Sequence, residues 1–111
     1  MSAVITRQEL ADAIDAGRVT VVEALGAQYF EHGHLPTAIN IPHTDVPELA
    51  PSLLPDKDAP IVVYCSNAEC QNSAISQGVL RRMGYTNVRK YAEGKQDWEA
   101  AGLPLESSVA A

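Results

Sequence analysis

The strongest constraint on the fold is one short apolar run, the sequence IVVY at residues 61–64. A continuous apolar run of this length, rich in β-branched residues, predicts a buried strand. Strands covered on both faces are typical of parallel sheets that carry helices on either side. The run ends at Cys65, and a polar loop separates this cysteine from a helix predicted at residues 73–83. A thiol is therefore expected at the carboxyl end of the most buried strand.

The rest of the chain alternates between short strand patterns and short helix patterns. The first helix is expected to begin at a capping box, Thr6 with Glu9, and to end at Gly17. Further strands are predicted at residues 19–22, 38–41 and 88–91, and further helices at residues 28–32, 45–54 (in part) and 96–101. This alternation predicts an α/β fold, a parallel β-sheet flanked by helices on both faces.

The helix predicted at residues 73–83 has apolar residues at helical spacing. Ile75, Val79, Leu80 and Met83 are expected to share its buried face. Trp98, in the last predicted helix, is expected to point into the core.

The length of 111 residues suits a single domain, with a core of about residues 6–106. The formal net charge of −6 argues against nucleic acid or an anionic membrane as a partner. The first ten residues, MSAVITRQEL, lack the basic start and apolar stretch of a signal peptide. Two cysteines are fewer than disulfide-stabilised secreted domains of this size carry, so we expect a cytoplasmic protein with reduced thiols.

Cys65 is the candidate nucleophile. Ligands bind beyond the carboxyl ends of strands in open parallel sheets. The amides of the loop and the N-terminus of the following helix stabilise an anion there, which lowers the pKa of a cysteine. The alternative is a buried, inert cysteine that behaves as a small apolar residue.

Several segments of the chain are similar to segments of the rhodanese family, in the same order. They are residues 33–42 (GHLPTAINIP), residues 62–65 (VVYC), residues 83–88 (MGYTNV), and residues 94–98 (GKQDW) with 101–104 (AGLP). Together they extend the resemblance over residues 6–106. It implies a rhodanese-like sheet and a sulfurtransferase that holds sulfane sulfur as a persulfide on Cys65.

On this resemblance the backbone amides of the loop would stabilise the outer sulfur of the persulfide, as an oxyanion hole stabilises oxygen. The loop residues expected to bind substrate are Ser66, Asn67, Ala68, Glu69, Gln71, Asn72 and Ser73. The implied partners are a sulfur donor (a small thiol, thiosulfate or a protein persulfide) and an acceptor nucleophile. No cofactor is implied, and two cysteines with three scattered histidines match no zinc-binding pattern.

Three positions depart from the family pattern. The acidic residue after the first core strand, Glu23, is not followed by the usual arginine, because Leu25 stands there. The loop is two residues longer than usual, with Asn72 in place of its arginine, and Glu93 replaces the first glycine of a pair. Without arginine the loop lacks a bidentate clamp for an anionic donor, so a small-thiol or protein donor is favoured over thiosulfate. The same absence argues against a phosphatase of the Cys-x5-Arg type.

Cys70 lies in the same loop and leaves two alternatives open. It attacks a persulfide or sulfenate on Cys65 and forms a disulfide, or it only fills the loop interior. A catalytically weak binding or regulatory module, or a dithiol redox switch, is the alternative to a sulfurtransferase. Of the other polar residues, His34 is expected to hydrogen-bond the backbone. Lys95 is expected to be solvated, and the alternative is a contact with the loop that supplies the positive charge the loop lacks.

Overall fold

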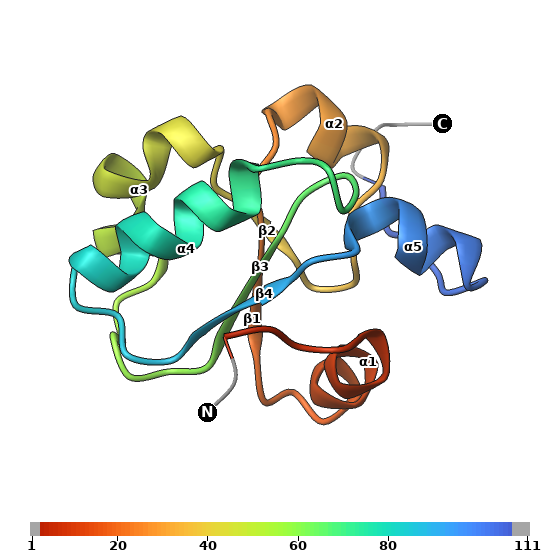
Figure 1. Ribbon diagram of the computed structural model, residues 1–111, viewed down its shortest axis with the longest axis horizontal. Coiled ribbons are helices and arrows are strands. Elements are labelled where there is room, and N and C mark those ends of the chain that lie inside the picture. The colour runs from red at the N-terminus through yellow and green to blue at the C-terminus, as the bar shows by residue number, and fades with distance from the viewer. Residues whose placement is uncertain (1–2, 108–111) are drawn as a thin grey trace.

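The computed structural model describes residues 3–107 and shows a four-stranded parallel sheet with helices on both faces (Figure 1). The strands are β1 (Thr20–Glu23), β2 (Ile39–Asn40), β3 (Ile61–Tyr64) and β4 (Val88–Tyr91). The helices are α1 (Arg7–Asp15), α2 (Ala27–His32), α3 (Val46–Leu53), α4 (Asn72–Arg82) and α5 (Gly94–Ala100), and a 3₁₀ turn, η1 (His43–Asp45), precedes α3. The predicted fold class is confirmed.

Strand β3 lies inside the sheet, whose order is β2-β1-β3-β4. Its partners are β1, with Val22 opposite Val63, and β4, with Tyr64 opposite Tyr91. All four residues of β3 are buried, as their apolar run predicted. The carboxyl end of β3, and with it Cys65, therefore opens at the edge of the sheet where ligands bind in such folds.

Two apolar clusters cover the two faces of the sheet. On one face, Val22 and Val63 belong to the same cluster as Ala50 of α3 and Leu80 of α4. On the other face Val21, Val62 and Tyr64 pack against α1 and α5 through Leu10 and Trp98, and Phe30 of α2 borders this cluster. The inward position of Trp98 and the capping box between Thr6 and Glu9 are both as predicted.

The buried face of α4 differs from the prediction. Ile75 is 45% exposed, because the stripe that faces the sheet consists of Ser73, Ser76, Gln77 and Leu80. Val79 and Met83 pack at its border. The burial of Gln77 in this stripe is compensated, because its amide donates to the carbonyl oxygens of Ala3 and Val88 at 2.8 and 3.1 Å. The buried hydroxyl of Ser76 has no hydrogen-bond partner within residues 3–107.

Within residues 3–107, no helix has the length and apolar character needed to cross a bilayer.

Candidate active site

Cys65 is the first residue after β3 and is almost fully covered. It is 1% exposed, and its sulfur lies 3.4 Å from the carbonyl oxygen of Cys70 and 3.4 Å from Oγ of Ser73. Ser73 lies in the first turn of α4, and its backbone N–H also faces the Cys65 sulfur. The strand, the loop and the helix N-terminus thus meet at this sulfur.

Burial raises the pKa of the Cys65 thiol, and its hydrogen bond to Cys70 acts in the same direction. The Ser73 hydroxyl and backbone N–H lower the pKa but do not outweigh burial. The expectation of a lowered pKa at Cys65 is therefore wrong. Its physical reason is that removal from water disfavours the thiolate more than the few donors on this side of the loop favour it.

The loop amides do not form one cradle around Cys65. The side-chain oxygen of Asn67 accepts hydrogen bonds from the backbone N–H groups of Glu69 and Cys70, at 3.0 and 3.1 Å. The backbone N–H groups of Ser66 and Asn72 face the sulfur of Cys70 instead. The loop amides therefore do not all face one sulfur, contrary to the prediction. Asn67 engages the N–H groups of Glu69 and Cys70, and the other N–H groups named here face either Cys65 or Cys70.

Cys70 is half-buried, its carbonyl oxygen lies 3.4 Å from the Cys65 sulfur, and the two thiols are close enough to influence each other's pKa. Its partial burial raises the pKa of its thiol, but hydrogen bonds from Cys65, Asn72 and Ser66 outweigh this effect, so the pKa is lowered overall. The structure thus brings both candidate cysteines together as free thiols, and the pKa is lowered at Cys70 and raised at Cys65.

The other loop residues lie further from the sulfurs or turn outward. Ala68, Glu69 and Gln71 are exposed. The Asn72 side chain, at the position of the missing arginine, donates to the carbonyl oxygen of Ala24 at 3.5 Å. These side chains tie the loop to β1 or face solvent, and nothing in them replaces the positive charge of an arginine.

The N-terminus of α5 packs directly on the loop. The backbone N–H of Lys95 donates to the Cys65 carbonyl at 2.8 Å, and that of Gln96 donates to the Ser66 carbonyl at 2.9 Å. Gly94 has a φ of +76°, and a Cβ there would lie 2.7 Å from the Cys65 carbonyl oxygen. A glycine is therefore required at position 94, the second position of the family's glycine pair. Glu93, at the first position of that pair, is exposed and adopts an ordinary helical conformation.

A buried ion pair lies beneath the loop. Glu23, which is fully buried, accepts from Lys95 Nζ at 2.9 Å and from the Tyr64 hydroxyl at 2.7 Å. The Lys95 side chain is 16% exposed, so the expectation that it is solvated is wrong. Sequence reasoning missed this pair, although an acidic residue without its usual arginine was the signal that another cation must meet it.

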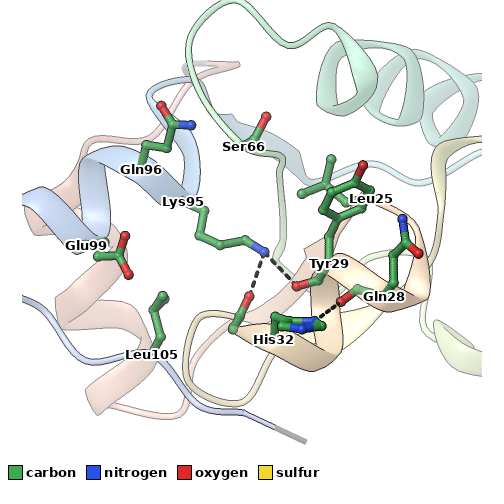
Figure 2. Close-up of a pocket in the computed structure, with 10 residues that line it drawn as sticks. Leu25, Gln28, Tyr29, His32, Ser66, Lys95, Gln96, Glu99 and Leu105 are labelled. Carbon is green, nitrogen blue, oxygen red and sulfur yellow. Dashed lines mark hydrogen bonds between the residues drawn. The ribbon is translucent and has the colours of Figure 1, made fainter. Parts of the chain in front are cut away.

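A cavity of about 610 Å³ lies between α2 and α5 (Figure 2). Its lining is mostly apolar and consists of Leu25, Gln28, Tyr29, His32, Gly33, Ser66, Lys95, Gln96, Glu99 and Leu105. The Lys95 ammonium also donates to the carbonyl oxygens of Tyr29 and Gly33, at 3.2 and 2.6 Å. With Glu23 these acceptors occupy all three of its N–H groups.

A family model for the rhodanese-like domain matches residues 6–101, which is most of the chain. The chain belongs to the rhodanese-like domain family. Cys65 lies directly after β3, an internal strand of the parallel sheet.

The relatives and solved structures similar to this rhodanese-like domain include a regulator and a sulfurtransferase. The chain is 35% identical over 105 residues to the HTH-type transcriptional regulator Rv0324 of Mycobacterium tuberculosis, covering 95% of this chain and 45% of that one. It is 34% identical over 70 residues to the thiosulfate sulfurtransferase PspE of Escherichia coli, covering 63% and 64%. The chain thus spans about half to two thirds of the length of these relatives. The BH2092 protein of Bacillus halodurans has the same fold, with a TM-score of 0.89 at 24% identity, over 96% of this chain and 78% of that one.

His34 of the rhodanese-like domain has the structural role expected of it. Its Nδ1 lies 2.8 Å from the carbonyl oxygen of Phe30, and the two rings stack with centroids 3.9 Å apart. The histidine thereby fixes the segment that leads from α2 to β2.

Proposed function

We propose that this rhodanese-like domain is a sulfurtransferase that carries sulfane sulfur as a persulfide on Cys65. The observation that supports this proposal most strongly is the position of the Cys65 sulfur, at the end of β3 and against the first turn of α4. The Ser73 N–H faces that sulfur and stabilises negative charge on it. An acceptor nucleophile attacks the outer sulfur, and Cys65 leaves as a thiolate.

Cys70 gives the persulfide a second fate. Its thiolate attacks the inner sulfur of the Cys65 persulfide, a disulfide forms between the two cysteines, and hydrosulfide leaves. Sulfane sulfur is reduced in this step, and the two thiols are oxidised. The contact between the thiols supports it, since both sulfurs already lie in one hydrogen-bonded loop.

The charges around the site favour an organic thiol persulfide or a protein persulfide as the donor over thiosulfate. Lys95 bonds the loop through its backbone N–H, and its side-chain charge is neutralised by Glu23 at 2.9 Å. The apolar cavity beside Ser66 holds Glu99 as well, so the entrance offers little attraction to a dianion. An uncharged organic group, by contrast, gains from burial in such a lining.

A regulatory module is the second candidate function. It is supported by the match of nearly the whole chain to part of a transcriptional regulator, and by the paired thiols, which suit a dithiol switch. In that role the loop would report the oxidation state of its cysteines to a partner protein without turning over a sulfur donor.

Intact mass spectrometry separates the two candidates. Reduced protein is incubated with glutathione persulfide and, separately, with thiosulfate. A sulfurtransferase gains one sulfur atom, and returns to its starting mass when an acceptor thiol such as dithiothreitol is added. The Cys65→Ser/Cys70→Ser double variant is the control and gains nothing. If the wild-type protein forms no adduct with either donor, the sulfurtransferase proposal is wrong and the regulatory module is favoured.

A further inference from the structure

We call the loop at residues 65–72 the active loop, because the proposed function places the chemistry there. Its two thiols differ in their exposure to solvent. Cys65 is 1% exposed, and its sulfur contacts the carbonyl oxygen of Cys70 and the hydroxyl of Ser73. Cys70 is half-buried in a loop whose neighbouring residues, Glu69 and Gln71, are exposed. A donor molecule arriving from solvent therefore meets the sulfur of Cys70 before that of Cys65.

The hydrogen bonds also favour Cys70 as the attacking atom. The backbone N–H groups of Ser66 and Asn72, the Ser66 hydroxyl and the Cys65 thiol all face its sulfur. These donors stabilise a thiolate on Cys70, and the pKa of this thiol is lowered overall, whereas burial raises the pKa of Cys65. The thiolate is the nucleophilic form of cysteine.

We propose that sulfur enters the domain through Cys70 and passes from there to Cys65. The inference rests on the proposed sulfurtransferase function and adds a direction to it: Cys70 is the intake residue, and Cys65 is the carrier.

The relay consists of two exchanges in which no atom is oxidised overall. In the first, the Cys70 thiolate attacks the outer sulfur of a donor persulfide, the donor S–S bond breaks, and the donor leaves as a thiolate. In the second, the sulfur of Cys65 attacks the outer sulfur of the Cys70 persulfide. The Cys70 S–S bond breaks, and the proton of the Cys65 thiol passes to the departing Cys70 sulfur, so that Cys65 carries the persulfide and Cys70 returns to a thiol.

The relay explains why a covered cysteine suits the carrier role. A persulfide on Cys65 lies within the loop, with the Ser73 N–H beside its sulfur, and is less exposed to thiols in bulk solution than a persulfide on Cys70. A persulfide held only on Cys70 would stay open to premature attack.

Stopped-flow mixing with glutathione persulfide, followed by quenching, digestion and peptide mass analysis, tests the relay. In Cys65→Ser, Cys70 gains one sulfur and keeps it, because the second exchange is blocked. In Cys70→Ser, Cys65 is loaded at least about tenfold more slowly than in the wild type, because the accessible thiolate is gone. Ala74→Ser, on the exposed side of α4, is a control for handling and loads at the wild-type rate.

Two results would overturn the relay in different ways. If Cys70→Ser and Cys70→Ala both load Cys65 at the wild-type rate, and Cys65→Ser takes up no sulfur, the donor reaches Cys65 directly; the relay is then wrong and the proposed function stands. If the wild-type protein takes up no sulfur, the relay and the proposed function both fail. Thermal melting of each variant confirms that the compared proteins are folded.

Discussion

Lys95 Nζ lies 2.9 Å from Oε1 of the fully buried Glu23, directly beneath the loop that carries both cysteines. The same lysine contributes its backbone N–H to the Cys65 carbonyl. One residue of α5 thus holds the active loop through its backbone and neutralises the buried acid of β1 through its side chain.

Replacing Lys95 by methionine is expected to lower the free energy of unfolding by about 3–5 kcal/mol, because one partner of a buried pair is left uncompensated. Urea denaturation measures this change. The matched variant Glu23→Gln/Lys95→Met removes both charges and is expected to recover much of the loss, since Tyr64 retains an oxygen to donate to. Equal stability of Lys95→Met and the wild type would show that the pair does not stabilise the fold.

Gly94→Ala tests the close contact between α5 and the active loop. A left-handed conformation costs an ordinary residue about 1–2 kcal/mol, and the added Cβ also overlaps the backbone of Cys65 and Asn67. Gly102→Ala is the matched control, because Gly102 has a φ of +81° with no atom near its added Cβ. Urea denaturation should show a larger loss for Gly94→Ala than for Gly102→Ala, and equal losses would contradict the proposed contact.

The opposite pKa shifts of the two thiols predict the pH dependence of their alkylation. Because the pKa of Cys70 is lowered and that of Cys65 is raised, iodoacetamide should modify Cys70 first as the pH rises. The rate of Cys70 alkylation should level off at a pH below about 8.5, the ordinary thiol pKa. Cys65 should react only at a pH above that value. Peptide mass mapping of the reduced protein across pH 5–10 measures both. Alkylation of Cys65 at a lower pH than Cys70 would show that Cys65, and not Cys70, is the more acidic thiol.

The missing arginine predicts the donor preference. Sulfur uptake from glutathione persulfide should be faster than uptake from thiosulfate at equal concentration. Asn72→Arg should raise the thiosulfate rate by about tenfold, which corresponds to roughly 1.5 kcal/mol from one charge-assisted hydrogen bond. Asn72→Gln keeps the amide without the charge and should leave the rate unchanged. A wild-type protein that uses thiosulfate as readily as the organic persulfide would contradict this preference.

Local patterns predicted most of the fold and the place of the site. The IVVY run gave the buried β3, the capping box gave the start of α1, and the polar segment after β3 gave the active loop. Ile75 was misplaced because helical spacing alone does not reveal that a polar stripe, anchored by Gln77, faces the sheet.

The electrostatics of the site depend on contacts that sequence spacing does not contain. Glu23 and Lys95 are far apart in the chain and meet only when α5 packs against the sheet. The acidity of Cys65 depends on how completely the loop covers it, and on which sulfur each loop N–H faces. The Asn67 side chain contributes to this arrangement, because its oxygen accepts from the N–H groups of Glu69 and Cys70 and so keeps them from the sulfurs.

The location of the bound sulfur at equilibrium is the most direct test of the account. Wild-type protein is loaded with glutathione persulfide, freed of excess donor, trapped with an alkylating reagent and digested. Fragmentation of the peptide that contains both cysteines should locate the extra sulfur on Cys65. Extra sulfur found at Cys70 alone, or at neither cysteine, would contradict the assignment of Cys65 as the carrier.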